Sequence, residues 1–180
     1  MRFPAKDATA FETPALLHER GLAVRAASDG DLPFLAALYA VTRHAELAAA
    51  AWPDDVRQAF LDSQFALQHR HYVGHYPDAD FMVIHRDGEP LGRFYLAHDG
   101  EDDLVVDIAL LPAWRGQGIG QALIEAAARQ ASTRGRGLHL HVLHTNLAAR
   151  RLYERLGFRA DGDTGMHLHM RRAPAALAVS

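Results

Sequence analysis

Apolar and polar positions along the chain follow two periods, which predict strands and helices in a mixed order. Short apolar or alternating runs predict strands at 22–27, 80–86, 90–98, 103–111 and 137–144, with a final pair around Phe158 and at 166–171. Apolar residues at helical spacing predict helices after Asp31, from near Pro53, over 118–134 and over 146–157. A meander followed by strand–helix–strand–helix–strand predicts one α/β domain with a mixed sheet.

Turn signals and aperiodic segments set the boundaries of this domain. The dipeptide Asp87-Gly88 predicts a hairpin, because it suits tight turns whose twist matches that of paired strands. Residues 1–20 are polar and lack periodicity. We therefore expect an irregular N-terminal arm over 1–20, the folded domain over 21–172 and a C-terminal tail over 173–180.

Composition narrows the class of protein without identifying it. The chain has 180 residues and a formal net charge of −3, so nothing indicates nucleic acid or a membrane surface as a partner. It has no cysteine, which excludes disulfides, a thiol nucleophile and thiolate metal ligands. No apolar run resembles a signal peptide or approaches the roughly 20 residues of a membrane-spanning helix, so we expect a cytoplasmic protein.

Three glycines stand at alternate positions directly before the helix predicted over 118–134. Gly116, Gly118 and Gly120 cost backbone entropy, yet they leave the amides of the first helical turn open to an anion. The helix dipole favours negative charge there and Arg115 can add a contact, so a diphosphate is the favoured ligand. The alternative is a close-packed turn between strand and helix. The loop is neither a P-loop nor a dinucleotide fingerprint, so by itself it does not identify the ligand.

A second motif, "NLAARRLYERLGF", runs from Asn146 to Phe158. On a helix Asn146 is a good N-cap, Gly157 closes the end, and apolar residues form a stripe between them. Tyr153 lies next to that stripe. An isolated tyrosine in this position is most simply a core or half-buried aromatic whose hydroxyl has found a partner.

Together the two segments resemble the signature of the GNAT superfamily of acyl-CoA N-acyltransferases. "IALLPAWRGQGIG" matches its Arg/Gln-x-x-Gly-x-Gly/Ala loop through Arg115, Gly118 and Gly120. The later segment matches Asn-x-x-Ala-x-x-Leu-Tyr-x-x-x-Gly-Phe through Asn146, Ala149, Leu152, Tyr153, Gly157 and Phe158. The resemblance implies a GNAT-like fold, with six or seven mostly antiparallel strands splayed centrally and flanked by about four helices.

The resemblance also implies a binding site for acetyl-CoA. The pyrophosphate is expected on the loop that starts at Gly116, with Arg115 alongside and main-chain amides from Gln117, Gly118, Ile119 and Gly120. Main-chain groups at Leu110 and Leu111 are expected to contact the pantetheine arm, in a strand that often carries a bulge in this family. Asn146 and Ala149 complete the set of coenzyme contacts, and Tyr153 is expected near the thioester sulfur.

The implied reaction is N-acetyl transfer to a primary amine of a small molecule or peptide. Without a cysteine to carry the acyl group, we expect direct attack in a ternary complex, with Tyr153 as the general acid that protonates the leaving thiolate. Asp107 interrupts an otherwise apolar strand and is the best candidate for the base. The alternative role of Asp107 is pairing with a nearby arginine or capping a turn.

The chain has twelve histidines, so a metal site has to be considered. His139/His141 and His167/His169 are strand-alternating pairs, but such pairs only share a face, and a metal needs a third convergent ligand, so no metal is expected. His69, His71 and His75, with Tyr72 and Tyr76, are instead candidates to line the acceptor pocket. One of these imidazoles is an alternative base.

Two other classes of protein fit parts of the pattern. One is a non-catalytic acyl-CoA-binding or regulatory module, which would not need the intact Asn146 and Tyr153. The other is a nucleotide-binding switch, which would need a P-loop lysine. The sequence does not specify the amine acceptor, because acidic residues that could attract a cationic amine are scattered, and it does not specify whether the chain forms a homodimer.

Overall fold

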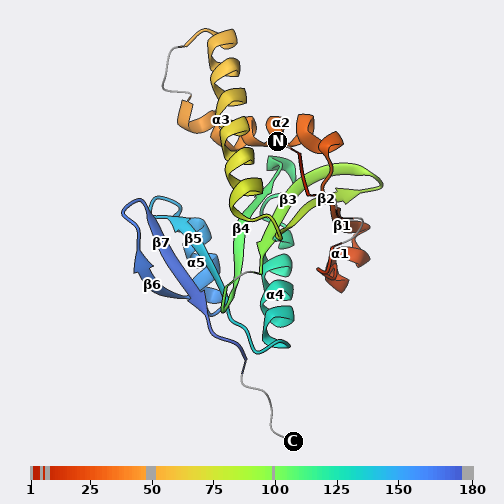
Figure 1. Cartoon of the computed structure of the whole chain (residues 1–180), viewed down its shortest axis with the longest axis vertical. Helices are drawn as coiled ribbons and strands as arrows, with labels where there is room; N and C mark the ends of the chain where they lie inside the picture. The colour runs from red at the N-terminus through yellow and green to blue at the C-terminus, as the bar shows by residue number, and fades with distance from the viewer. Residues whose placement is uncertain (1, 5, 7–8, 48–51, 99, 176–180) are drawn as a thin grey trace, which may run out of the picture.

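The protein is built around a mixed sheet of seven strands (Figure 1). The computed structural model describes residues 2–4, 6, 9–47, 52–98 and 100–175. The strand order is β1-β2-β3-β4-β5-β7-β6, and every pair is antiparallel except β4 with β5. The strands are β1 (Leu22–Ala26), β2 (Asp80–Arg86), β3 (Glu89–Ala97), β4 (Asp103–Leu110), β5 (Leu138–Leu143), β6 (Arg159–Asp163) and β7 (His167–Arg172). The predicted mixed sheet is confirmed.

Helices cover both faces of this sheet. Successive side chains of a strand point to opposite faces, so each face has its own buried core. On β2, Phe81 and Val83 pack with α2 (Leu32–Leu47) and α3 (Asp54–His75). Met82 and Ile84 point the other way, into a core shared with α1 (Ala15–Glu19), α4 (Ile119–Ser132) and α5 (Leu147–Arg155). Short 3-10 helices, η1 (Asp29–Asp31) and η2 (Pro112–Trp114), precede α2 and the glycine loop. In the part of the chain that the structure describes, no helix has the length and apolar character needed to cross a membrane.

The sheet splays between β4 and β5. These strands pair only where Asp103–Val105 lies beside Leu138–Leu140, and beyond that point they diverge (Figure 1). The register of β3 against β4 also shifts, since Tyr95 pairs with Asp107 and Leu96 with Val105. Val106 is therefore a β-bulge at the point where the splay begins. Both the central splay and the bulge implied by the resemblance are present.

The N-terminal arm is less irregular than its polar composition suggests. Residues 15–19 form α1, one helix more than the about four expected. Phe3, Phe11 and Leu17 are buried, and Phe11 packs edge-on against Phe94 at a centroid distance of 5.3 Å. Periodicity could not reveal this, because a non-helical chain can bury apolar residues at any spacing. Of the C-terminal tail, residues 176–180 lie outside the described residues.

A charge cluster joins the arm to the ends of β2, β3 and β4. The imidazole of His98 lies between two buried carboxylates, with Nε2 3.3 Å from Asp80 Oδ2 and Nδ1 3.1 Å from Asp103 Oδ2. These two carboxylates, Asp103 first, raise the pKa of His98 to about 9. Lys6 pairs with Asp80 at 3.1 Å and Arg136 with Asp103 at 2.8 Å. Burial alone would raise the pKa of both carboxyls, but their cationic partners outweigh it and lower the pKa.

This cluster predicts that stability falls as the pH rises above neutrality. The pKa of His98 is raised from 6.5, so its contribution is complete below pH 6.5 and is lost as the pH approaches about 9. Since the side chain is 31% exposed, we expect about 2 kcal/mol of the free energy of unfolding to be lost over that interval. Urea unfolding across this pH range measures the loss. His98→Gln should remove this pH dependence and His71→Gln, on an exposed face of α3, should keep it; equal curves for the two variants would contradict the assignment.

Candidate active site

The glycine loop that follows β4 is open and bare. Gly116 and Gly118 have φ of 70° and 79°, and a Cβ built on either would meet no atom within 4 Å. Close packing therefore does not explain these two glycines; the left-handed backbone and the open space do. Gly118 is the N-cap of α4, so the amides of Ile119 and Gly120 lie at the positive end of that helix. This arrangement suits an anion.

Two arginines flank the loop. The Nε of Arg115 donates to the carbonyl of Leu110 at 2.9 Å, and the Nη1 of Arg20, just after α1, donates to the carbonyl of Gln117 at 2.5 Å. Each guanidinium uses one N–H in this contact and keeps donors that face solvent. Arg115 was predicted, whereas Arg20 was missed because nothing in the arm signals its return to the loop. Guanidinium groups in this position suit phosphoryl oxygens.

The edge of β4 that faces β5 lies next to the loop. Within the described residues β5 pairs with β4 only as far as Val105, so from Val106 onward this edge has main-chain groups without a strand partner. At its end the amide of Leu111 donates to the carbonyl of Leu91 at 2.9 Å, while the Leu110 carbonyl accepts from Arg115. The predicted positions Leu110 and Leu111 thus lie where the free edge meets the loop, and each forms one of these hydrogen bonds.

Tyr153 lies on α5, the helix that follows β5. Asn146 caps this helix as predicted, with its Oδ1 accepting the amide of Ala149 at 3.2 Å. The side chain of Tyr153 is buried, and its ring lies 5.9 Å from that of Phe158. Burial, followed by the charge of Asp107, raises the pKa of Tyr153 to about 12. No side chain or backbone group of the described residues is hydrogen-bonded to its hydroxyl, which remains available as a donor.

Asp107, the residue after the bulge, lies in a polar network under α3. Its Oδ2 accepts from the hydroxyl of Tyr72 at 2.9 Å and from Nη2 of Arg93 at 2.8 Å. The same Nη2 donates to Gln68 Oε1 at 3.0 Å, and the guanidinium lies over the ring of Tyr95 at 5.6 Å. Arg93 is buried, so the pairing with an arginine that was the alternative role for Asp107 exists in the structure.

Arg93 is the member of this network that sequence reasoning missed. It interrupts the apolar run of β3 as Asp107 interrupts that of β4. Two opposite charges in adjacent apolar strands are a usable signal, since neither can be buried alone without a large desolvation cost. Pairing them required the register, in which Tyr95 lies opposite Asp107.

The predicted histidine cluster is divided by α3. His69 is buried against Phe3 and Phe65, while His71 and His75 lie on an exposed face and stack at 5.3 Å. Tyr72 is the member of the cluster that contacts Asp107.

The second group of histidines lies on β5 and β7. His139 Nδ1 is 2.9 Å from His169 Nε2, and burial, together with neighbouring imidazoles, lowers the pKa of His139. Across the described ranges, no three His, Asp or Glu side chains are grouped so as to hold a metal ion.

In comparison with known proteins, part of the chain matches the model of one family and is similar in sequence to several proteins. Residues 77–160 match the model of the acetyltransferase (GNAT) domain. A mycothiol acetyltransferase of Nocardiopsis dassonvillei is 40% identical over 73 residues, which are 40% of this chain and 19% of that protein. A streptothricin acetyltransferase of Streptomyces lavendulae is 36% identical over 87 residues, which are 45% of this chain and 46% of that protein. The chain therefore spans less than half the length of each of these relatives.

Solved structures share the fold. A paia N-acetyltransferase from Thermoplasma acidophilum, in complex with coenzyme A, superposes with a TM-score of 0.65 at 17% identity. The alignment covers 84% of this chain and 98% of that one. At this identity the likeness concerns the arrangement of helices and strands, which agrees with the seven-stranded sheet and its central splay.

Proposed function

We propose that this chain transfers the acetyl group of acetyl-CoA to a primary amine, because residues 77–160 match the model of the GNAT acetyltransferase domain, the family that the two motifs resemble. One observation carries the proposal: the bare loop before α4 follows β4, whose edge is free beyond Val105, and the charge of Asp107 on that strand helps to raise the pKa of Tyr153. The relatives named for acetyl transfer support the same class of reaction.

The coenzyme is assigned to the loop side of the splay. The amides from Gln117 to Gly120, with Gly116 ahead of them and Arg115 beside them, hold the pyrophosphate, and Arg20 adds a second guanidinium. The free edge of β4 near Leu110 and Leu111 holds the pantetheine arm as an added strand does. Asn146 uses its Oδ1 as the cap of α5, with Ala149 as the donor, so its amide nitrogen is the group left for the coenzyme.

Transfer proceeds by direct attack with both substrates bound. The neutral amine attacks the thioester carbonyl and forms the C–N bond; the C–S bond then breaks as the oxyanion collapses. Tyr153 gives its proton to the departing thiolate and regains one from solvent. Its pKa of about 12 keeps the phenol protonated across the neutral range, so it is a donor when the thiolate forms. The nitrogen loses a proton to a base, so the overall products are an amide and coenzyme A.

We assign the role of base to Asp107, acting on the amine directly or through a water molecule. Both of its protein donors act on Oδ2, and its charge, after burial, contributes to the raised pKa of Tyr153. Arg93 and Tyr72 hold the carboxylate in place and are positioning residues.

Asp107→Asn tests this assignment, because the amide keeps the shape and cannot accept the proton. We expect kcat/KM to fall by about 10–100-fold. The loss should be larger for an acceptor amine with a pKa near 10.4 than for an α-amine near 7.7–8.0, which is already partly neutral at pH 7.5. Kinetics with one acceptor of each kind measure the difference. An equal loss for both amines would assign Asp107 to positioning alone.

The activity itself is tested by amine-dependent release of coenzyme A. Because the chain has no cysteine, a thiol reagent reports only the product thiol. A panel of amino acids, peptide N-termini, polyamines and aminoglycosides, each with acetyl-CoA, covers the main classes of acceptor. Release that depends on one of these amines supports the enzyme. Tight binding of acetyl-CoA with no release from any amine would favour the non-catalytic acyl-CoA-binding module.

A further inference from the structure

The N-terminal arm ends beside the glycine loop that precedes α4. The arm turns into β1 at Gly21, whose φ of 68° lies in the left-handed region that glycine favours. Arg20 stands directly before this turn, and its Nη1 donates to the carbonyl of Gln117 at 2.5 Å. The two residues are 97 positions apart in the sequence, so this hydrogen bond ties the loop to a distant segment of the chain.

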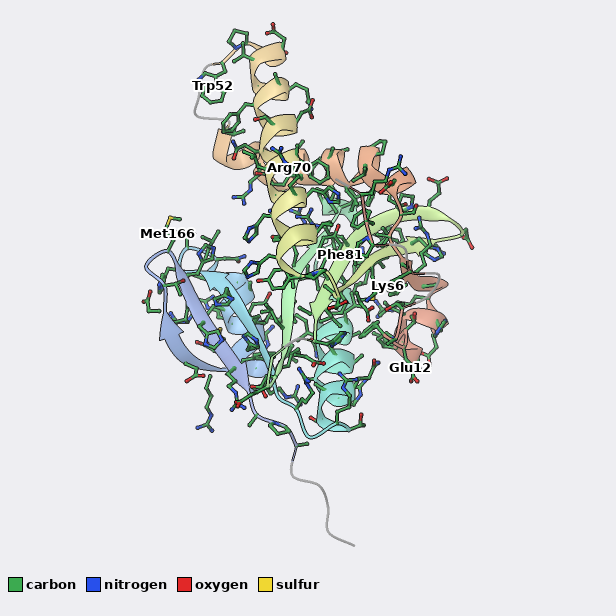
Figure 2. All side chains as sticks on the ribbon, viewed as in Figure 1. Lys6, Glu12, Trp52, Arg70, Phe81 and Met166 are labelled. Carbon is green, nitrogen blue, oxygen red and sulfur yellow. The ribbon has the colours of Figure 1, made fainter. Side chains whose placement is uncertain are left out.

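The arm is fixed to the domain before it reaches the loop. Leu17 of α1 is buried, and the hydroxyl of Thr13 accepts a backbone amide of β1 at 3.2 Å. Figure 2 labels Glu12, whose backbone forms two hydrogen bonds with the side-chain amide of Gln130 on α4, at 3.0 and 3.3 Å. The arm therefore contacts α4 near its C-terminal end and the loop before its N-terminal end, and Arg20 extends from a fixed backbone.

The peptide between Gln117 and Gly118 has little local restraint. Gly116 and Gly118 have φ of 70° and 79°, and glycine adopts positive and negative φ about equally, so backbone preference does not fix which way this peptide points. The peptide is trans, so its carbonyl and its N–H point in opposite directions. In one orientation an anion at the start of α4 meets the amide of Gly118, and in the other it meets the carbonyl of Gln117.

Two side chains of the loop fix other carbonyls. Gln117 Nε2 donates to the carbonyl of Ala113 at 2.7 Å, and Arg115 Nε donates to the carbonyl of Leu110 at 2.9 Å. Neither bond acts on the peptide between Gln117 and Gly118. Among the side chains that the structure describes, Arg20 is the one hydrogen-bonded to this peptide, and no backbone group of the described residues accepts the amide of Gly118.

We propose that Arg20 is a positioning residue of the coenzyme site, which holds the carbonyl of Gln117 toward the arm so that the amide of Gly118 faces the pyrophosphate. The role rests on the proposed function, because the pyrophosphate of coenzyme A is the anion assigned to this loop. A guanidinium suits the task, since a charged donor binds a carbonyl more strongly than a neutral one does. This role is separate from the charge that the remaining donors of Arg20 offer to a phosphoryl oxygen.

Calorimetric titration of the full chain with coenzyme A, at low salt and at high salt, tests the role. Arg20→Met keeps the aliphatic stem and removes the donors and the charge. We expect it to raise the Kd by about tenfold, the effect of losing one charge-assisted hydrogen bond. The rise should persist in about 1 M NaCl, where charges are screened within about 3 Å, because the orientation of the peptide does not depend on screening. A rise that disappears at high salt would reduce Arg20 to a charge and overturn the proposal.

Two further variants provide the controls. Arg86 lies over the ring of Trp114 at 5.9 Å, directly before the loop, and is hydrogen-bonded to no loop residue that the structure describes. Arg86→Met therefore removes a nearby charge alone and should change the Kd at high salt by less than about twofold. Arg20→Lys keeps a cationic donor for the carbonyl and should bring the Kd to within about threefold of the original chain. Equal effects of Arg20→Met and Arg86→Met, or no rescue by lysine, would refute the role.

Kinetics and unfolding separate this role from the proposed function. In Arg20→Met the KM for acetyl-CoA should rise about tenfold while kcat stays within about twofold, because the loop binds the coenzyme away from the reacting thioester. Thermal unfolding of Arg20→Met should match that of Arg86→Met, which excludes a general loss of structure. Failure of the original chain to bind coenzyme A would refute the proposed function and this role together. Tight binding by the original chain with an unchanged Kd in Arg20→Met would refute the role of Arg20 alone.

Discussion

Tyr153→Phe is expected to lower kcat for acetyl transfer by about 10²–10³-fold while the Kd for acetyl-CoA changes by less than about twofold. The variant keeps the buried ring against Phe158 and removes only the hydroxyl, which is hydrogen-bonded to no described residue. Without its proton the thiolate must leave as an anion in a site whose burial already disfavours charge. Steady-state kinetics, with titration calorimetry for the coenzyme, separate the two quantities.

The control for this variant is Tyr39→Phe, which removes the hydroxyl of another buried tyrosine, on α2. It should leave kcat within about twofold of the original chain. Because the pKa of Tyr153 is about 12, this phenol should not produce a decline of kcat between pH 7 and 10. Unchanged turnover in Tyr153→Phe would remove the general acid from the mechanism.

Gly118→Ala is expected to raise the Kd for coenzyme A by about 10–100-fold, because the methyl group enters the space through which an anion reaches the first amides of α4. The residue has φ of 79°, so alanine also strains the backbone by about 1–2 kcal/mol. Calorimetric titration with coenzyme A measures the affinity, and thermal unfolding measures the strain.

Gly135→Ala separates these two effects. Gly135 has φ of 70°, and a Cβ there also meets nothing within 4 Å, but it follows the far end of α4. The two variants should lose similar stability, and only Gly118→Ala should lose affinity for coenzyme A. If the two variants had the same affinity for coenzyme A, the glycine loop would have a structural role only and would not bind phosphate.

Motifs with local geometry were readable from the sequence. A glycine loop before a helix and an Asn-capped helix each depend on residues a few positions apart, so their spacing predicts the N-cap at Asn146 and the bare start of α4. The resemblance to the GNAT family rested on the order of these two motifs, and residues 77–160 match the model of that family's domain. The strand runs were equally local, because alternation within one strand shows which side chains share a face.

Pairings between distant residues were not readable. The pairing of Asp107 with Arg93 depends on the register of β3 against β4 and on the position of α3 above them. Neither the register nor the position of the helix produces a periodic pattern in the sequence. The arm was judged by its polarity, yet Phe3 and Phe11 are buried and Arg20 returns to the loop. Each of these contacts joins segments far apart in the chain, where single-sequence patterns carry little information.

The sequence alone determined the class of fold, the helix N-terminus available for an anion and the presence of a tyrosine one helix later. Only the tertiary structure decided that β4 parts from β5 beyond Val105, and that the charge of Asp107 helps to raise the pKa of Tyr153. It also decided that Arg20 of the arm meets the carbonyl of Gln117 in the glycine loop. The physical reason is that backbone preferences depend on residues a few positions apart, whereas burial and charge pairing depend on which surfaces of the whole chain come into contact.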